Sequence, residues 1–539
     1  MATPVLSADE AAALIQDGDT LAIEGSGGGL VEPDALIAAL ARRYRRTGRP
    51  RGLTLLHSTG MGDRESRGLS ELALDGLCRR VIGGHWGMGA QMARLAADNR
   101  IEAYNLPQGV LNQLYREIAA GRPGVITHVG LGTFVDPRLE GGRLNSVTTE
   151  DLVEVVELGG REWLFYKSLP IDVAFIRGTT ADEDGNISME QEVATLCMLE
   201  AAQATHNCGG IVIAQVKRLA VGGSLPARWV QVPGPLVDVI VVHESQWQTY
   251  EAEYNPAFCG EIRVPLQRMK PLPLDMRKVV ARRAAMELLP GAVVNLGFGM
   301  PDGVAVVAAE EGVSRMFTLT IEQGAVGGIP AGGLIFGASA NPGAVVDAPD
   351  QFDFYDGGGL DLTCLGMAQA DGNGDVNVSK YGSTITGTGG FVDISQNAKK
   401  VVYCATFTAG GLEVEIRDGA VHVVREGRHR KFVRRVDQVT FSGEYARRRG
   451  QRVLYVTERA VFELLPEGVV LTEIAPGVDL RRNVLDNMEF EPVVSRDLRV
   501  MDRRLFDPAP MGLAADLAGR GNGGMRPALR ERLAALREV

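Results

Sequence analysis

Glu322 occupies a position where a carboxylate is able to react with a ligand. It follows residues 317–321, an apolar stretch that predicts a short strand, and three glycines and Pro330 come soon after it. Glycine and proline in this pattern indicate an irregular, sharply turning backbone. In an open α/β sheet, ligands bind in the crevice beyond the carboxyl ends of the strands. Glu322 is therefore the main candidate for a reacting group, and a glutamate that caps the following turn is the alternative.

Other familiar catalytic arrangements are missing from the sequence. It contains no G-x-S-x-G elbow and no G-x-x-x-x-G-K-[ST] loop, which argues against an α/β-hydrolase and a P-loop NTPase. The seven histidines form no H-E-x-x-H motif and no His/Cys pairing at ligand spacing, so no metal site is predicted. Glycine loops after strands supply backbone N–H groups that hold anions. A site with such donors and no Ser-His or Cys-His machinery is expected to use a carboxylate.

Two glycine loops also invite a dinucleotide-binding interpretation. Residues 25–30 read G-S-G-G-G-L, and residues 297–302 read G-F-G-M-P-D. Both lack the third glycine of the G-x-G-x-x-G fingerprint that positions a pyrophosphate at a helix N-terminus. NAD-dependent redox chemistry is therefore disfavoured.

The elements around these loops occur twice along the chain. A predicted strand, glycine loop and helix at 19–40 are repeated at 292–309, and two further similarities keep the same order. They pair residues 181–187 with 370–376 and residues 211–214 with 401–404. Strands that alternate with amphipathic helices indicate parallel sheets covered on both faces. We therefore expect an α/β protein with two similar, open α/β halves, a duplicated arrangement of mostly parallel sheets covered by helices.

The spacing of the repeats suggests where one half is longer. The offset is about 270 residues for the first pair and about 190 for the other two, so the first half carries an insertion of about 80 residues. The segment with Pro271 and Pro273 resembles a linker. The expected domains are residues 1–267, a linker at 268–278, residues 279–518, and a peripheral tail at 519–539.

Composition and net charge restrict the partners and the cellular compartment that are expected. The 539 residues include 67 glycines, and the formal net charge is -11, which disfavours nucleic acid as a partner. Six cysteines without a C-x-x-C pair fit a reduced compartment. We find no signal or transit peptide and no apolar run long enough for a bilayer. A cytoplasmic protein without a membrane partner is expected.

Five motifs, in collinear order, resemble those of family I CoA-transferases, and most closely those of the fused, single-chain acetate or acyl-CoA:3-oxoacid type. The similarity covers about residues 5 to 515. The two halves then resemble the α and β subunits of that family, joined in one chain, with the active site between them. The motifs are P-Q-G at 107–109, G-L-G-T-F-V-D-P-R at 130–138, N-L-G-F-G-M-P at 295–301, T-I-E-Q-G at 320–324 with G-G at 327–328, and G-T-G-G-F-V-D at 387–393.

The resemblance implies a reaction and a role for each candidate residue. CoA would pass from a short-chain acyl-CoA to a free carboxylic acid of the acetate, propionate or 3-oxoacid class, by a ping-pong mechanism through a glutamyl-CoA thioester. Glu322 aligns with the family's nucleophile. Backbone N–H groups of Gly27, Gly28 and Gly29 are candidate oxyanion donors. Gln108 is expected to orient the carboxylate or the incoming acid, with a simple turn residue as the alternative.

CoA binding is expected at two glycine pairs, and no cofactor is expected. Gly297 and Gly299 precede a predicted helix, whose N-terminus suits CoA phosphate or pantetheine. The resemblance implies that Gly389 and Gly390 bind CoA, and it also makes them candidates for backbone oxyanion donors. Exchange of one carboxylate for another needs neither metal nor redox cofactor, because CoA itself is a substrate. Fused members of the family also imply a homo-oligomer, a dimer or a tetramer.

Two other functions remain open from the sequence. An acyl-CoA hydrolase on the same fold would use water in place of the acceptor acid. A non-enzymatic, effector-binding α/β module would bind a small molecule and would not need a reactive glutamate.

Overall fold

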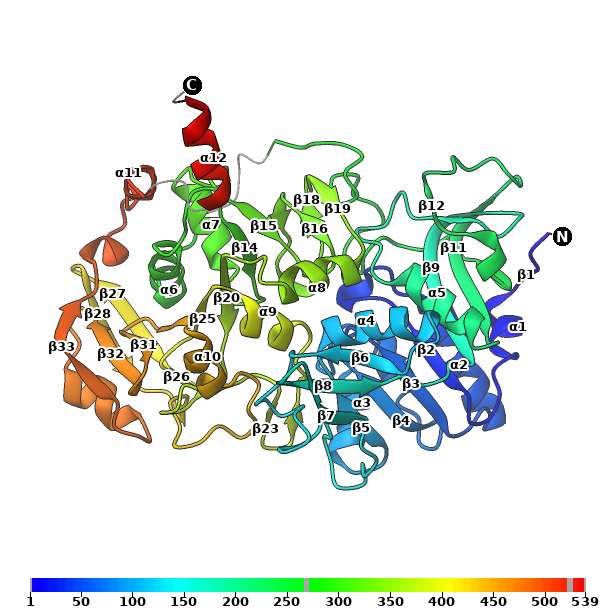
Figure 1. Ribbon diagram of the computed structural model, residues 1–539, viewed down its shortest axis with the longest axis horizontal. Coiled ribbons are helices and arrows are strands. Elements are labelled where there is room, and N and C mark those ends of the chain that lie inside the picture. The colour runs from blue at the N-terminus through cyan, green and yellow to red at the C-terminus, as the bar shows by residue number, and fades with distance from the viewer. Residues whose placement is uncertain (1, 266–270, 521–526, 538–539) are drawn as a thin grey trace.

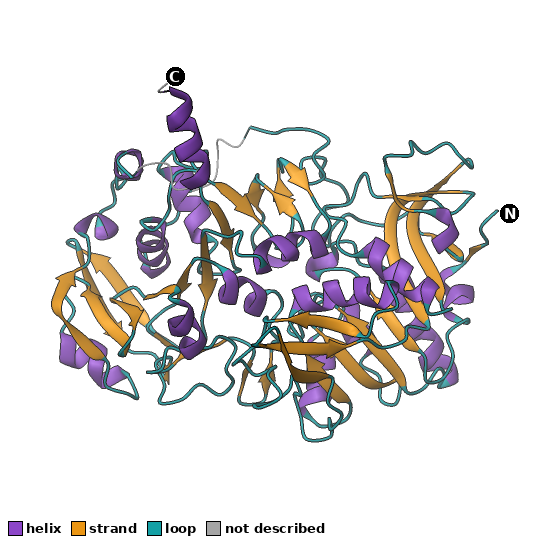
Figure 2. Cartoon of the chain, viewed as in Figure 1, coloured by secondary structure: helices purple, strands orange, loops and turns teal. Residues whose placement is uncertain are grey.

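The computed structural model describes residues 2–265, 271–520 and 527–537. Two α/β halves lie side by side: in Figure 1 the first occupies the right of the view in blue to green, and the second the left in green to red. Each half is built on a ten-stranded sheet. Figure 2 shows helices in front of and behind the strands of both halves. The expected architecture of two open α/β halves is confirmed.

The first sheet follows the order β1-β13-β11-β9-β2-β3-β4-β5, and all neighbours along this path are parallel. Two short strands are antiparallel to this sheet: β10 pairs with the carboxyl end of β9, and β12 pairs with β10. Its central strand β9 is buried along its whole length, as expected when helices cover both faces of a parallel sheet. The strands are β1 (Val5–Leu6), β2 (Thr20–Ile23), β3 (Leu53–His57), β4 (Cys78–Gly83), β5 (Glu102–Asn105), β9 (Val173–Asp182), β10 (Ile187–Ser188), β11 (Ile211–Ala220), β12 (Val230–Val232) and β13 (Val239–Val242).

The second sheet follows the order β19-β16-β15-β14-β20-β25-β30-β31-β32-β33. Its centre, from β15 to β30, is parallel, whereas antiparallel pairs lie towards both edges. The strands are β14 (Val293–Leu296), β15 (Thr318–Thr320), β16 (Ala325–Val326), β19 (Ala344–Val345), β20 (Leu362–Gly366), β25 (Lys400–Cys404), β30 (Arg452–Val456), β31 (Ala460–Leu465), β32 (Gly468–Ile474) and β33 (Val493–Val500).

The two sheets share a strand order, which supports the duplication inferred from the sequence. The path β13-β11-β9-β2-β3 of the first sheet corresponds to β30-β25-β20-β14-β15 of the second. The first half is longer between β3 and β9, where it carries β4, β5 and a separate antiparallel sheet. That sheet consists of β6 (Gly124–Thr127), β7 (Val153–Leu158) and β8 (Arg161–Lys167). This segment accounts for the expected insertion.

Helices such as α2 pack on a face of a sheet through an apolar side. In α2, the alternation of buried and exposed residues ends at Gly48, which adopts a left-handed φ of 66° as the C-cap, a role that glycine fills without steric cost. In β2, Leu21 and Ile23 enter the core on one face, and Ala22 enters the core on the other. The helices are α1 (Ala8–Ala12), α2 (Asp34–Thr47), α3 (Ala90–Ala97), α4 (Gln108–Ala119), α5 (Met198–Asn207), α6 (Met276–Ala285), α7 (Gly303–Glu310), α8 (Ala348–Asp356), α9 (Phe391–Asn397), α10 (Gly443–Arg449), α11 (Leu513–Ala518) and α12 (Pro527–Arg537).

Backbone pairing joins the two halves directly. His85, just after β4, forms an isolated antiparallel bridge with Gly387 of the second half. On either side of this bridge, Trp86 N–H donates to the carbonyl of Thr386 at 2.8 Å, and Gly389 N–H donates to that of Gly84 at 2.8 Å. One apolar core also continues across the boundary, since Val392 packs with residues of the first half. The halves therefore form one connected structure.

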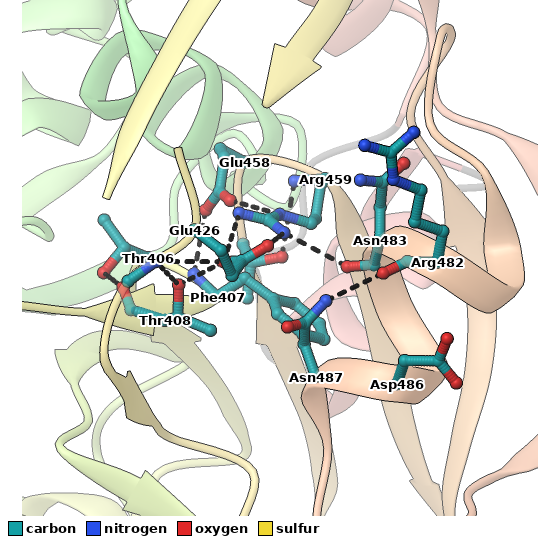
Figure 3. Close-up of polar contacts among 12 residues, drawn as sticks. Thr406, Phe407, Thr408, Glu426, Glu458, Arg459, Arg482, Asn483, Asp486 and Asn487 are labelled. Carbon is teal, nitrogen blue, oxygen red and sulfur yellow. Dashed lines mark hydrogen bonds and ion pairs between the residues drawn. The ribbon is translucent and has the colours of Figure 1, made fainter. Parts of the chain in front are cut away.

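A buried cluster of charges around Arg459 joins the loops that follow β25 and β30 (Figure 3). Arg459 and Glu458 are both 0% exposed. The Arg459 guanidinium donates to Glu458 at 2.6 Å and to Glu426 at 2.8 Å. Glu458 also accepts the backbone N–H of Phe407 at 2.9 Å. This cluster fixes two loops of the second half at the edge where the strands end.

The predicted linker lies partly outside the described residues. Of residues 268–278, positions 271–275 form no helix or strand, and α6 begins at Met276. The predicted tail 519–539 also lies partly outside them, and α12 forms its described end. The domain boundaries stay predictions.

Candidate active site

A cavity of about 280 Å³ lies between the two halves. Its walls are loops at the carboxyl ends of strands: Thr59 and Gly60 follow β3, Gly297 follows β14, and Gly366 ends β20. This is the crevice in which open α/β sheets bind ligands. A cavity therefore lies where the active site is expected, between the halves.

The Glu322 side chain lines this cavity and is half-buried. It stands in a tight turn after β15, closed by hydrogen bonds of 2.9 Å from Ile321 N–H to Ala325 and from Gly324 N–H to Ile321. Gly324 has a φ of 111°, and a Cβ there would lie 2.0 Å from the carbonyl oxygen of Val346. Only glycine fits this position. The turn therefore holds Glu322 in one direction, towards the cavity.

Burial raises the pKa of the Glu322 carboxyl from 4.5 to about 7, although the side chain of Gln323 acts in the opposite direction. Among the described residues, Arg64 is the other charged side chain that lines the cavity. A carboxylate removed from water without a close counter-ion is a stronger nucleophile than a solvated one. The site therefore suits Glu322 for attack on an acyl group.

Hydrogen bonds behind Glu322 fix the end of β15. The Tyr355 hydroxyl donates to Thr320 Oγ1 at 2.9 Å and accepts from Gln351 Nε2 at 2.7 Å. Asn295 Nδ2 donates to the Thr320 carbonyl at 3.3 Å. Gln351 and Tyr355 lie one turn apart on α8, so they share a face of that helix. Helix α8 thus braces the strand that presents the glutamate.

Gln108 begins α4, is 2% exposed and lines the cavity. Its backbone N–H donates to the carbonyl of Gly389, in the second half, at 3.0 Å. Its side-chain Nε2 is buried and has no hydrogen-bond partner among the described residues. A buried amide without a partner costs free energy, unless a ligand accepts its hydrogen bond. This geometry favours the predicted orienting donor over a simple turn residue.

The predicted glycine donors separate into two groups. Gly27, Gly297, Gly389 and Gly390 line the cavity, whereas the remaining three do not. The N–H of Gly297 donates to Cys364, and that of Gly389 to Gly84, each at 2.8 Å. These two glycines therefore border the cavity without offering a free N–H. Gly27 and Gly390 stay predictions as oxyanion donors.

Three glycine assignments find no support in the structure, because these glycines do not line the cavity. Gly28 donates its N–H to the carbonyl of Gly62 at 2.9 Å, so it is unavailable to an oxyanion. Gly29 packs against the ring of Tyr250. Gly299 turns its carbonyl towards the Arg277 guanidinium, at 3.2 Å, away from the cavity. The physical reason is shared: consecutive residues of a tight loop point in different directions, so not all of them face one ligand.

Several lining residues were not identified from the sequence, among them the titratable side chains of His85 and Arg64. His85 Nδ1 is buried and has no hydrogen-bond partner in the described part of the chain. Burial lowers the pKa of the His85 imidazole to about 4, so the ring is neutral at pH 7. The signal was present, since His85 stands in G-G-H-W-G after β4, another glycine loop that follows a strand.

The described residues are expected to contain neither a metal site nor a membrane-spanning helix. They contain no group of three or more His, Cys, Asp or Glu side chains that would hold a metal ion. None of their helices is long and apolar enough to cross a bilayer.

A half-buried carboxylate at a strand end, in a cavity that a buried neutral amide also lines, suits acyl transfer through a carboxylate nucleophile. Comparison with known proteins agrees with this class. The family model described as Coenzyme A transferase matches residues 5–243. The chain is 49% identical to the acetate CoA-transferase YdiF of Escherichia coli K12, over 94% of this chain and 96% of that protein.

Two further similarities support the assignment. The chain is 49% identical to the caffeate CoA-transferase of Acetobacterium woodii, over 94% of this chain and 98% of that protein. The crystal structure of the acyl-CoA transferase YdiF apoenzyme from Escherichia coli O157:H7 superposes with a TM-score of 0.92 and 48% identity, over 95% of this chain and 97% of that chain. The chain belongs to the coenzyme A transferase family. It is an enzyme that transfers CoA to carboxylates.

Proposed function

We propose that the enzyme exchanges CoA between a short-chain acyl-CoA and a free carboxylic acid, with Glu322 as the covalent nucleophile. The observation that carries this proposal is the Glu322 carboxyl in the cavity between the halves, with a pKa raised by burial to about 7. A solved structure of the E. coli O157:H7 relative is described as a thioester complex with CoA, which supports a covalent CoA intermediate here.

The proposed reaction passes through two covalent intermediates on Glu322, an anhydride and then a thioester. A Glu322 carboxylate oxygen attacks the thioester carbonyl, the C–S bond breaks, and an acyl-glutamyl anhydride and CoA thiolate result. The thiolate then attacks the glutamyl carbonyl, and the first acid leaves as a carboxylate. CoA remains on Glu322 as a thioester. The second acid reverses both steps, so no net proton transfer, metal or redox group is required.

Neutral donors suit this sequence of intermediates. Each attack places negative charge on a carbonyl oxygen, and fixed donors together with held reactants contribute on the order of 10 kcal/mol to such steps. The buried Nε2 of Gln108 supplies a neutral donor. A positively charged donor in its place would trap the thiolate. Gly27 and Gly390 supply the backbone candidates.

The size and the apolar lining of the cavity favour small acids as substrates. Leu334, Phe336 and Phe391 form much of its apolar lining, and about 280 Å³ remains for the reacting group. We propose acids of the acetate, propionate or 3-oxoacid class. Because one relative is named a caffeate CoA-transferase, an aromatic acid belongs in the test.

The test combines a covalent readout with competition among acids. Acetyl-CoA is added to the enzyme without acceptor, and intact-protein mass spectrometry with peptide mapping is expected to show CoA on Glu322. Mixtures of propionate, acetoacetate and caffeate are then supplied, and new acyl-CoA is followed by mass. Rapid release of CoA without any acid would favour the hydrolase, and no adduct on Glu322 would refute the proposed nucleophile.

Three further properties are proposed on the family resemblance and the chemistry. The enzyme acts in the cytoplasm, needs no cofactor because CoA is a substrate, and associates as a dimer or a tetramer. Sedimentation velocity measures the number of copies. Activity that survives exhaustive dialysis against a chelator is the expected result for an enzyme without a metal.

A further inference from the structure

A second cavity opens beside the reaction cavity. It has a volume of about 570 Å³. Arg64, His85, Phe298 and Thr386 line both cavities, and we call these four residues the neck. Arg94 of α3 lines the second cavity but not the first. We call this second space the outer cavity, because it joins the site of Glu322 to the exposed aromatic side chains of Phe298 and Tyr381.

Arg64 is held in the neck by an unusual backbone conformation. Its φ is 70°, in the left-handed region, which costs a non-glycine residue free energy on the order of 1 kcal/mol. Its N–H donates to the carbonyl of Met88 at 2.9 Å. Strain of this kind persists only where the surrounding structure enforces it, and it is concentrated at functional sites.

The loop around Arg64 is fixed at several points. Gly62 N–H donates to the buried carboxyl of Glu32 at 3.1 Å, and the Gly62 carbonyl accepts from Gly28. The Asp63 carboxylate accepts three consecutive backbone N–H groups, from Glu65 to Arg67, at 2.8 to 3.0 Å. The backbone is thus tied down on both sides of Arg64.

The Arg64 guanidinium, in contrast, has no ionic partner within the described residues. It is exposed and lies over the ring of Phe298, 4.6 Å from the ring centroid. The outer cavity also presents Arg94, and none of the described residues that line it is acidic. In a protein with a net charge of -11, a passage lined by two arginines and no acid attracts an anion.

We propose that Arg64 binds a phosphate group of the CoA substrate, so that the nucleotide end of CoA occupies the outer cavity while the thioester passes the neck to Glu322. The inference rests on the proposed function. Guanidinium groups bind phosphate oxygens through paired hydrogen bonds. The exposed rings of Phe298 and Tyr381 offer faces on which an adenine base stacks.

This placement differs from the one expected at the Gly297–Gly299 loop. The first N–H groups of α7 are already engaged, because Gly303, Val304 and Ala305 donate to backbone carbonyls of the preceding loop at 3.0 to 3.3 Å. Its N-terminus therefore offers less to a phosphate than the neck does. Phosphate binding at the neck would also hold the reactive end of CoA near Glu322, which is how remote binding energy assists a reaction.

Arg64 is also able to bind the second carboxylate of a dicarboxylic acid. The experiment therefore distinguishes a phosphate of CoA from such a carboxylate. Arg64→Gly removes the guanidinium and suits the left-handed backbone, so it is expected to fold. Arg67→Ala is the matched control: it removes the same charge from the same loop, its guanidinium lies over Tyr250, and it lines neither cavity.

Each variant is assayed with acetyl-CoA and with acetyl-pantetheine, which has the same thioester but no phosphate. Arg64→Gly is expected to lower kcat/KM for acetyl-CoA about 10- to 100-fold, the usual range for a lost hydrogen bond to a charged group. Its kcat/KM for acetyl-pantetheine is expected to match that of the parent. Arg67→Ala is expected to match the parent with both donors.

Other outcomes overturn the proposal. An equal loss with both thioesters would place Arg64 at the reacting group, and no loss with acetyl-CoA would exclude phosphate binding. A loss seen with succinate but not with acetate as acceptor would assign Arg64 to a second carboxylate. Formation of the CoA adduct on Glu322 by the parent enzyme tests the proposed function separately, and it does not depend on Arg64.

Discussion

His85 and Gly387 lie opposite each other in an antiparallel bridge that connects the two halves beside the reaction cavity. Gly387 has a φ of 76°, and a Cβ there would lie 2.8 Å from the backbone nitrogen of Trp86. No residue with a side chain satisfies both constraints. The closest approach of the two halves thus depends on a glycine.

Gly387→Ala is expected to push the halves apart at the bridge. A displacement of about 1 Å at a reacting centre is able to lower the rate on the order of 100-fold. Gly382→Ala is the matched control, because Gly382 also has a positive φ, of 56°, but has open space around its missing side chain. Comparison of kcat/KM and of the melting temperature for the two variants separates backbone strain from the steric clash. Equal loss of activity in both would contradict this account.

Glu322→Gln is expected to abolish the CoA adduct while stabilising the fold at neutral pH. The folded-state pKa of Glu322, about 7, lies above its ordinary value of 4.5. The folded protein therefore binds more protons than the unfolded chain between these values, and its stability falls as pH rises through this window. Relative to the parent, the variant should gain on the order of 1 to 3 kcal/mol above pH 7 and nothing below pH 4.5.

The measurement is thermal or denaturant unfolding of both proteins across this pH range. For the parent, the rate of adduct formation from acetyl-CoA should rise with pH through about 7, as the carboxylate forms. A stability difference that is the same at all pH values would show that Glu322 has an ordinary pKa. Peptide mass is checked, so that deamidation of the glutamine is not mistaken for residual activity.

Gln108→Leu is expected to reduce activity without loss of stability. The variant loses the donor in the cavity, and a drop in kcat/KM of about 10- to 100-fold is expected for a lost hydrogen bond to charged oxygen. Since Gln108 Nε2 has no partner in the described structure, its removal should leave the melting temperature unchanged or higher.

Asn112→Leu provides the control for Gln108→Leu. Asn112 lies one turn further along α4, is 0% exposed, and its Nδ2 likewise has no partner among the described residues, but it does not line the cavity. This variant should change stability only. If both variants lose activity to the same extent, the effect comes from helix α4 and not from a contact with substrate.

Arg459→Met is expected to lower stability by about 3 to 5 kcal/mol, because it leaves the paired carboxylates of Glu458 and Glu426 without a cation. The apparent melting temperature and the activity of the remaining folded enzyme are measured. Arg459 lies outside the lining of the reaction cavity, so kcat per folded enzyme should be retained. Glu426→Gln, added to Arg459→Met, should restore part of the lost stability.

The sequence predicted the architecture and the candidate nucleophile better than it predicted the other contacts of the site. The order of the repeats corresponds to two sheets with the same central strand order. Glu322 could be singled out because a strand, a glutamate and a set of glycines are adjacent in sequence, and the turn that they form is local.

The remaining parts of the site depend on contacts between distant residues. Gly27 and Gly28 are neighbours of the same type, yet one lines the cavity and the other is engaged by Gly62. That difference arises from the loop that carries Arg64, which only the folded chain brings alongside. His85 was missed for a similar reason, because its partner Gly387 belongs to the other half.

Helix α4 and the turn of Glu322 belong to opposite halves of one polypeptide, so neither half alone forms the lining of the reaction cavity. A ribosome that has synthesised only the first repeat has made the amide of Gln108 but not Glu322. Under the proposed mechanism, acyl-CoA present during translation therefore meets an unreactive intermediate. Under that mechanism, hydrolysis of acyl-CoA and transfer to a wrong acceptor become possible only after the second repeat has folded against the first.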